Sequence, residues 1–121
     1  MQPSAEAILD RYEHPLHRGP LATPPAVSAS ATNPRCGDEV HMYAEVSNGC
    51  VLRASFDGAG CTVSQAAADV AAELAEGHTL AEVLRLDLSD VLASLGPLRT
   101  RLDCAALGLL TLQRALVQLH A

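Results

Sequence analysis

Alternating apolar and polar residues predict a β-hairpin in the first half of the chain. Every second residue is apolar from Val40 to Val46, and the alternation resumes from Cys50 to Phe56. Because successive side chains of a strand point to opposite faces, this period indicates two strands that bury one face. Asn48-Gly49 lies between them and supplies the positive φ angles of a tight type I′ turn. A short edge strand is expected around residues 26–28, which follow a proline-rich segment.

Helical spacing prevails after this hairpin. Residues 64–76 are rich in alanine and end at Gly77, a residue suited to the left-handed position after a helix. Thr79 and Glu82 have the spacing of a capping box, which marks a helix start. Further helices are expected from Ser4 to Tyr12, from Ser89 and from Arg101 to Leu119. We therefore predict an α+β fold in which helices pack on one face of a small antiparallel sheet.

Length and composition fit one domain over residues 1–121. With 121 residues and 49% hydrophobic content, the chain can bury one ordinary core. There is no tryptophan, and the aromatic residues are Phe56, Tyr12 and Tyr43, so the core must consist of leucine, valine and alanine. Residues 1–20 are expected to form a mobile N-terminal arm.

Charge and hydropathy argue against two classes of partner. A net charge of −6 disfavours nonspecific binding to nucleic acid, which requires clustered positive charge. No run of about 18 apolar residues is present to span a membrane, and the start of the chain lacks a basic segment followed by an apolar one. We therefore expect a cytoplasmic protein, whose four cysteines stay reduced and act as ligands or nucleophiles rather than as disulfides.

Three of the cysteines stand where the backbone turns or a helix begins. Cys36 precedes Gly37-Asp38. Cys61 lies just before the alanine-rich helix, and Cys104 lies in the first turn of the last helix, where the helix N-terminus favours a thiolate. Thiolates select zinc, Cu(I) or the iron of iron–sulfur clusters, and the Asp38 carboxylate can complete a tetrahedron around such a metal. Since these residues are far apart in sequence, only the fold can gather them.

Each candidate residue also has a plain structural interpretation. A free cysteine is often a small core residue, and Asp38 after a glycine is ordinary turn chemistry. Cys50 lies on a predicted strand outside these segments and is assigned to packing. Arg35 and Arg101, and more weakly Arg99, either balance the negative charge of a thiolate site or are solvated surface charges. The histidines are assigned as non-ligands: His14, His17, His41, His78 and His120.

Three ordered blocks of sequence carry a family resemblance. They are Asn33–Asp38, Gly58–Ala66 and Arg101–Leu107, and an opening segment over Tyr12–Gly19 accompanies them. Each of the three blocks stands where one family of proteins places a ligand, and the match extends over nearly the whole chain. The chain resembles the NifU/IscU-type iron–sulfur scaffold family, which includes IscU, SufU and the N-terminal domain of NifU.

The resemblance implies a site, a cargo and partners. It assigns a zinc ion or a transient [2Fe–2S] cluster to four ligands, which are Cys36, Asp38, Cys61 and Cys104. Cys104 would be the persulfide acceptor, Cys36 and Cys61 the holding ligands, and Asp38 the weak ligand that keeps the product transferable. The expected partners are a cysteine desulfurase, which supplies sulfur, and downstream apo-proteins or cluster carriers. Such a protein is a scaffold rather than a conventional enzyme.

Asp103 bears on the branch of the family. It stands where the IscU branch has a histidine, and it is expected to complement the helix dipole, with metal ligation as the alternative. The SufU branch also lacks this histidine, so the alternative function is a SufU-like zinc-dependent sulfurtransferase that carries persulfide without building a cluster. The insertion that SufU proteins usually have between the second and third cysteines is absent here.

Two further roles are not expected. IscU proteins carry a Leu-Pro-Pro-Val-Lys motif that a specialised Hsp70 reads, whereas this chain has Leu-Gly-Pro-Leu-Arg over residues 95–99. A purely structural zinc domain normally closes its site with four thiolates, and Asp38 argues against that role.

Overall fold

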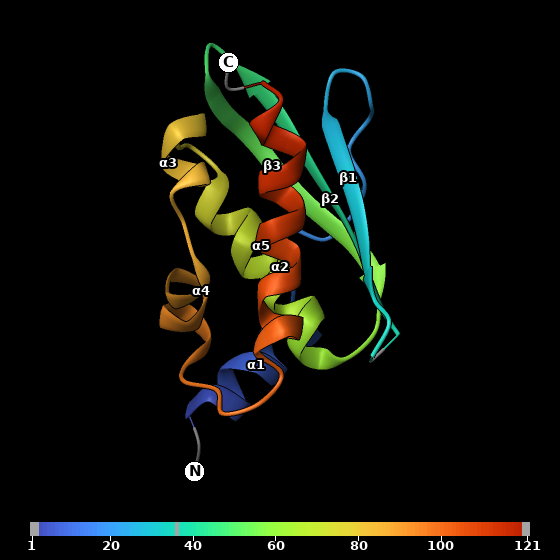
Figure 1. Ribbon diagram of the computed structural model, residues 1–121, viewed down its shortest axis with the longest axis vertical. Coiled ribbons are helices and arrows are strands. Elements are labelled where there is room, and N and C mark those ends of the chain that lie inside the picture. Colours follow the sequence, from blue (N-terminus) through green and yellow to red (C-terminus); the bar gives the residue numbers. More distant parts are fainter. Residues whose placement is uncertain (1–2, 36, 120–121) are drawn as a thin grey trace.

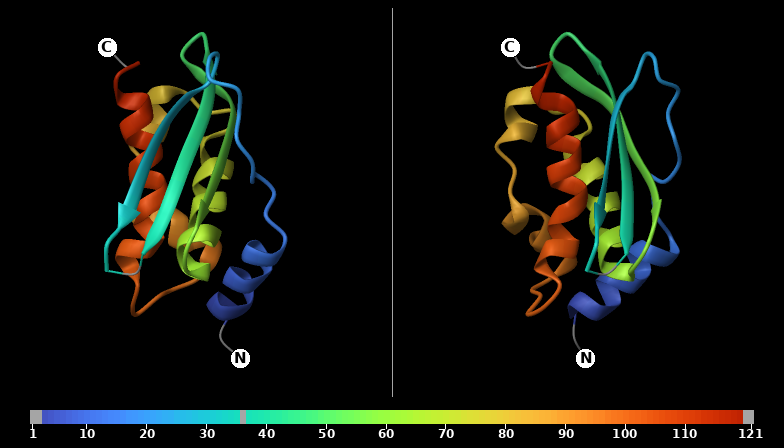
Figure 2. Two further views of the ribbon diagram at one scale, coloured as in Figure 1. Left: turned by 90° about the vertical axis from the view of Figure 1, so that its right-hand side faces the viewer. Right: turned by 45° about the vertical axis from the view of Figure 1, so that its right-hand side comes forward.

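The structure is a computed structural model that describes residues 3–35 and 37–119. A three-stranded antiparallel sheet in the order β1, β2, β3 carries two long helices, α2 and α5, on one face (Figures 1 and 2). The elements are α1 (Pro3–Glu13), β1 (Val27–Asn33), β2 (Asp38–Ser47), β3 (Cys50–Ala59), α2 (Thr62–Ala75), α3 (Leu80–Leu84), α4 (Leu88–Leu95) and α5 (Leu102–Val117). The predicted fold class, α+β with helices on one face of a small antiparallel sheet, is confirmed.

The hairpin of β2 and β3 forms where the alternating pattern predicts it. The turn residues Asn48 and Gly49 have φ angles of 53° and 76°, the left-handed values that match the twist of the flanking strands. The start of β3 differs from the prediction, because Val51 is buried and Leu52 is exposed. A register shift at Glu45/Val46 breaks the alternation there, as a β-bulge does.

The edge strand β1 is longer than the sequence pattern predicts. It covers residues 27–33 instead of 26–28 and pairs along its whole length with β2. Its exposed positions are the small polar residues Ser28, Ser30 and Thr32, and both positions between them are alanines. Such a segment has little hydrophobic contrast, so the strand forms through pairing with β2 rather than through its own pattern.

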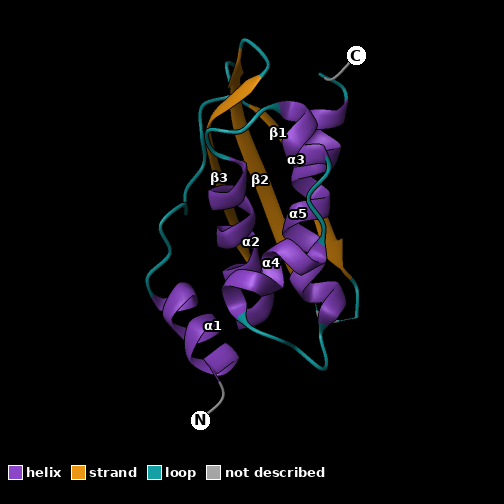
Figure 3. Ribbon diagram, turned by 90° about the vertical axis from the view of Figure 1, so that its left-hand side faces the viewer, coloured by secondary structure: helices purple, strands orange, loops and turns teal. Residues whose placement is uncertain are grey.

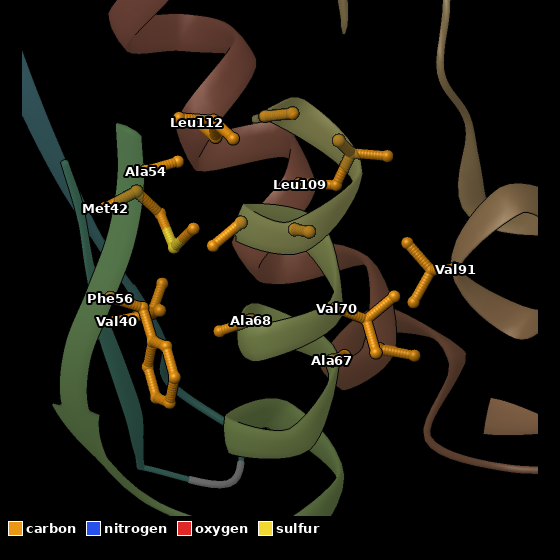
Figure 4. Close-up of a cluster of buried hydrophobic side chains, with 14 of the residues drawn as sticks. Val40, Met42, Ala54, Phe56, Ala67, Ala68, Val70, Val91, Leu109 and Leu112 are labelled. Atoms are coloured by element: carbon orange, nitrogen blue, oxygen red, sulfur yellow. The ribbon is translucent and has the colours of Figure 1, made fainter. Parts of the chain in front are cut away.

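The two central helices approach each other closely because small residues line their contact. A Cβ atom at Gly108 of α5 would lie 2.8 Å from the Cα of Ala68 in α2, so a larger residue would force the helices apart. Both helices run upward in Figure 1, and Figure 4 shows their buried side chains against those of the sheet. Cys61, which precedes α2, and Cys104, in the first turn of α5, therefore lie at the same end of the molecule.

The short helices α3 and α4 cover the side of α2 and α5 that faces away from the sheet (Figure 3). The predicted capping box is confirmed, because Thr79 Oγ1 accepts from Glu82 N at 3.1 Å and Glu82 Oε1 accepts from Thr79 N at 2.8 Å. The predicted start of the next helix at Ser89 is wrong by one residue. Asp87 is the N-cap of α4, since its carboxylate accepts from Ser89 N at 2.9 Å.

A buried carboxylate on α2 anchors the N-terminal segment. Asp69 is fully buried, and its Oδ1 accepts from the backbone N–H groups of Leu16 and His17 at 3.0 and 2.7 Å. Arg11 bonds to Asp69 at 3.0 Å and to Glu73 at 2.7 Å, and its hydrogen bond lowers the pKa of Glu73. These contacts hold residues 11–17 against the middle of α2.

The segment after this anchor covers the free edge of β3. Phe56 N donates to His17 O at 2.9 Å, and Gly19 N donates to Phe56 O at 2.7 Å, so the arm pairs briefly with the strand. An uncovered edge strand is prone to pairing with other chains. The expected mobility of residues 1–20 stays a prediction, which cleavage by trypsin can test. None of the described helices is long and apolar enough to cross a membrane.

Replacing Asp69 by alanine is expected to lower the free energy of unfolding by about 2–4 kcal/mol, because Arg11 and two backbone N–H groups lose a buried partner. Urea unfolding measures this loss. Glu73→Ala removes the more exposed partner of Arg11 and is the matched control, with an expected loss below about 1 kcal/mol.

Trypsin provides a second measurement on the same pair of variants. All eight basic residues are arginines, so faster cleavage after Arg11 and Arg18 in Asp69→Ala would report release of the arm. Equal stability losses in the two variants, or unchanged cleavage, would contradict the anchoring role of Asp69. Rapid cleavage at both sites in the unaltered protein would instead support a mobile arm.

Candidate metal centre

Three segments of the chain bring potential metal ligands together at one end of the sheet. Asp38 begins β2, Cys61 follows β3, and Cys104 lies in the first turn of α5. One carboxylate oxygen and the two sulfur atoms all lie within 4.8 Å of one another. Asp38 and Cys104 are fully buried, whereas Cys61 is half-buried. Within residues 3–35 and 37–119, this is the one group of cysteine, histidine and acidic side chains placed to share a metal ion.

Asp38 organises the loop that carries Cys61. Its Oδ1 accepts from Cys61 N at 2.8 Å, and its Oδ2 lies 3.6 Å from Cys61 Sγ. This contact requires glycine at position 60, where φ is +138° and a Cβ atom would lie 2.8 Å from the Cα of Asp38 and still closer to its carboxylate. Gly58 fits equally tightly against the backbone of Glu39. The glycines of this loop therefore let it approach the start of β2.

Cys61 is itself the N-cap of α2. Its Sγ accepts from Ser64 N at 3.4 Å, so the sulfur faces the first turn of the helix. Ser64 Oγ donates back to the Cys61 carbonyl at 3.1 Å. The sulfur therefore lies at the N-terminal end of α2, beside its backbone N–H groups.

Cys104 contacts a residue whose role the sequence reasoning missed. Asn33, at the end of β1, directs its Nδ2 toward Asp103 Oδ2 at 3.1 Å and toward Cys104 Sγ at 3.7 Å. In the sequence, Asn33 stands out only as the first residue of a family block. The sequence feature that could have indicated its role is its place at the end of an edge strand, three positions before the predicted ligand Cys36.

Asp103 points toward Asn33 rather than into the ligand group. Its side chain is half-exposed and is absent from the group formed by Asp38, Cys61 and Cys104. The hydrogen bond from Asn33 is the main cause that lowers the pKa of Asp103 below its ordinary value, with backbone N–H groups of the first turn adding to it. These contacts agree with the expected role at the helix N-terminus.

The predicted charge-balancing arginines have different surroundings. Arg35 is largely exposed, and its Nη1 lies 4.0 Å from Asp103 Oδ2. Arg101 is the N-cap of α5 and has a left-handed φ of 59°, and Arg99 is exposed. The role of these charges toward the site stays a prediction. Cys36, the fourth predicted ligand, lies outside the described residues.

Cys50 and four of the histidines assigned as non-ligands lie outside this group. Cys50 begins β3, at the opposite end of that strand from Cys61. His41 bonds to Ser30 on the sheet at 2.6 Å, and His17 bonds to Glu76 at 2.8 Å. His14 and His78 are also outside the group, and His120 falls outside the described part of the chain.

The donor set fits a thiophilic metal. Two thiolates and one carboxylate supply three of the four positions of a tetrahedron, and soft sulfur ligands favour zinc or iron–sulfur iron over hard cations. The hard oxygen of Asp38 is the weakest of these ligands for such a metal. The arrangement can therefore hold a metal or cluster and still release it.

These features define an α+β protein with a cysteine and aspartate group able to hold a metal ion. The chain belongs to the family of the NifU-like N terminal domain, whose model matches residues 4–121. This confirms the resemblance to NifU/IscU-type proteins that the sequence blocks indicated.

Individual relatives come from both branches of this family. The chain is 28% identical over 114 residues to the iron-sulfur cluster assembly scaffold protein IscU 1 of Archaeoglobus fulgidus. This match covers 93% of this chain and 74% of that protein. The chain is 27% identical over 81 residues to the zinc-dependent sulfurtransferase SufU of Bacillus subtilis, and this match covers 67% of this chain and 54% of that protein. The fold is similar to a crystal structure of a NifU-like N-terminal protein from Brucella abortus, with a TM-score of 0.79 and 21% identity over 95% of this chain and 92% of the other.

The Gly60→Ala substitution is expected to weaken zinc binding by about 10-fold or more, because the new Cβ atom would displace the Asp38 carboxylate. Competition with a chelating dye measures the affinity. Gly77→Ala is the matched control, since φ there is +83° and a Cβ atom would meet open space. It shares the backbone strain but should retain the affinity. Equal affinities in the two variants would contradict the role given to the Gly60–Asp38 contact.

Proposed function

We propose that this protein accepts sulfur from a cysteine desulfurase and holds a transient [2Fe–2S] cluster, or a metal ion, for transfer to apo-proteins. The observation that carries this proposal is the convergence of Asp38, Cys61 and Cys104, whose ligand atoms lie within 4.8 Å of one another. Family membership supports it, and the A. fulgidus relative is named as an iron–sulfur cluster assembly scaffold. Cys36 is the proposed fourth ligand.

Sulfur acceptance at Cys104 is an exchange between a thiolate and a persulfide. The Cys104 thiolate attacks the outer sulfur of the desulfurase persulfide, a new S–S bond forms at Cys104, and the desulfurase thiolate leaves with the electrons of the broken bond. Conversion of this sulfur to the sulfide of a cluster takes two further electrons from a reductant. Because Cys104 is fully buried, the site must open before the exchange occurs.

The remaining ligands have complementary roles in this proposal. Cys36 and Cys61 hold the cargo, and the Asp38 carboxylate is the ligand that exchanges most readily. The hydrogen bond that it accepts from Cys61 N holds the Asp38 carboxylate beside the sulfur of Cys61. The protein then acts as a scaffold, with no chemical conversion of a free substrate.

A zinc-dependent sulfurtransferase of the SufU kind is the second candidate. The observation that favours it is Asp103, which bonds to Asn33 at the position where the IscU branch has a histidine. The B. subtilis relative is named as such a sulfurtransferase. Zinc held by Asp38, Cys61, Cys104 and the predicted ligand Cys36 would keep the thiols deprotonated. Sulfur would then move as persulfide, and no cluster would form.

The proposed partners follow from this chemistry. A cysteine desulfurase supplies the sulfur, and downstream apo-proteins or cluster carriers receive the product. Recognition by a specialised Hsp70 is not expected, and a cytoplasmic location stays a prediction.

Anaerobic incubation of the purified protein with a cysteine desulfurase, cysteine, ferrous iron and dithiothreitol, followed by desalting, should yield a coloured protein with stoichiometric iron. Visible absorption and iron and zinc contents are the measurements. Cys61→Ser and Cys104→Ser should lose the charge-transfer bands, whereas Cys50→Ser is the control and should keep them, since Cys50 lies at the other end of β3.

Retained zinc without these bands, together with stimulated desulfurase turnover, would support the sulfurtransferase instead. A protein that retains neither metal nor sulfur would contradict both candidates.

Asp38→Asn and Asp38→Ala are expected to slow cluster transfer to an apo-acceptor by about 10-fold or more, because both remove the anionic oxygen ligand. The asparagine variant keeps an oxygen to accept from Cys61 N, so its melting temperature should stay close to that of the parent. The alanine variant should also lose about 1–3 kcal/mol of stability, since the partly buried N–H of Cys61 loses its acceptor. Unchanged metal retention, sulfur acceptance and cluster transfer in both variants would show that Asp38 lacks this role.

A further inference from the structure

Asn33 contacts two of the segments that contribute ligands to the site, the start of β2 and the first turn of α5. It is the last residue of β1 and pairs with Asp38, the first residue of β2. Its backbone oxygen accepts from Gly37 N at 2.8 Å, and its side-chain Oδ1 accepts from Arg35 N at 3.1 Å. One buried residue thus ties both ends of the connection between β1 and β2.

The other end of the same amide faces α5. Its Nδ2 lies 3.1 Å from Asp103 Oδ2 and 3.7 Å from Cys104 Sγ. A backbone N–H only donates and an ionised carboxylate only accepts, so Arg35 and Asp103 together determine which side of the amide carries the NH₂ group. That group has two N–H bonds, one for Asp103 and one for the sulfur of Cys104.

We propose that Asn33 is a positioning residue for Cys104. Its amide holds the sulfur through an N–H···S hydrogen bond, and Asp103 holds the amide in the orientation that makes this bond possible. The sulfur is thereby kept within reach of Asp38 and Cys61. This inference rests on the proposed function, in which Cys104 is a ligand and sulfur acceptor. The competing explanation is that Asn33 merely ties β1 to α5.

Exchanging the two polar side chains separates these explanations. Asn33→Asp alone places two carboxylates face to face, and Asp103→Asn alone removes the acceptor. The double variant Asn33→Asp, Asp103→Asn restores a hydrogen bond between the two positions, with donor and acceptor reversed. It restores the tie between β1 and α5, but residue 33 no longer offers an N–H group to Cys104.

Cobalt(II) titration of the four proteins reports on the sulfur ligands, because thiolate ligation gives an intense near-ultraviolet charge-transfer band. Each single variant should have a lower melting temperature than the parent. The double variant should regain the melting temperature, yet bind Co²⁺ about 10-fold or more weakly and with an altered charge-transfer band. Recovery of both the melting temperature and the Co²⁺ spectrum in the double variant would overturn the proposal.

A metal-free measurement keeps this test separate from that of the proposed function. The chain has two asparagines, Asn33 and Asn48, so ¹⁵N-asparagine labelling gives only two side-chain NH₂ signals. Cys104→Ala should shift one proton of the Asn33 NH₂ group and leave Asn48, in the exposed hairpin turn, unchanged. An unshifted Asn33 signal would overturn the positioning role. A folded parent protein without a Co²⁺–thiolate band would contradict the proposed function, while the NMR result would still decide the role of Asn33.

Discussion

The close contact between Ala68 of α2 and Gly108 of α5 is the constraint on which the site depends. Gly108 has no side chain and Ala68 has only a methyl group, so the two backbones lie close together and the helices cannot separate without losing this packing. Cys61 lies seven residues before Ala68, and Cys104 lies four residues before Gly108. At 1.5 Å per residue, both sulfurs lie within roughly 10 Å of the contact along the helices. A wider crossing would therefore increase the separation between two of the candidate ligands.

Asp38 links this helix pair to the sheet. Burying a carboxylate is costly unless hydrogen bonds compensate, and the backbone N–H of Cys61 supplies one of them. The same carboxylate is a candidate ligand, so the group that could bind a metal also determines the path of the loop before α2. The hydrogen bond between Asp38 and Cys61 thus shapes the loop and also places two candidate ligands side by side. Gly58 and Gly60 are needed for the loop path and for the ligand placement, since each allows the loop to approach β2.

Sequence patterns predicted the elements with strong periodicity and the residues with distinctive chemistry. The hairpin, the alanine-rich helix and the capping box at Thr79 were accessible because each has a local physical signature. Asp38, Cys61 and Cys104 could also be named as candidate ligands, because thiols and a carboxylate are donors that a thiophilic metal uses. Their spacing in the sequence could not predict that they meet, and this was expected only from the family resemblance.

The features that sequence reasoning missed depend on contacts between distant residues. The full extent of β1 follows from its pairing with β2, because its serine and alanine residues have little pattern of their own. The bulge at Glu45/Val46 changes which residue of β3 is buried, and no local signal marks it. The contacts of Asp69 with residues 16 and 17 and of Asn33 with Asp103 join positions more than 50 residues apart, so they cannot be predicted from neighbouring positions.

The anchoring of the N-terminal segment on Asp69 also has a consequence for the order of events during synthesis. Residues 16 and 17 leave the ribosome before their acceptor, which follows 52 to 53 residues later. The edge of β3 that the arm covers is also made later than the arm itself. Leu16 and His17 therefore lack this hydrogen-bond partner until Asp69 has been translated. Contacts of such long range are formed late and slow the search for the native state.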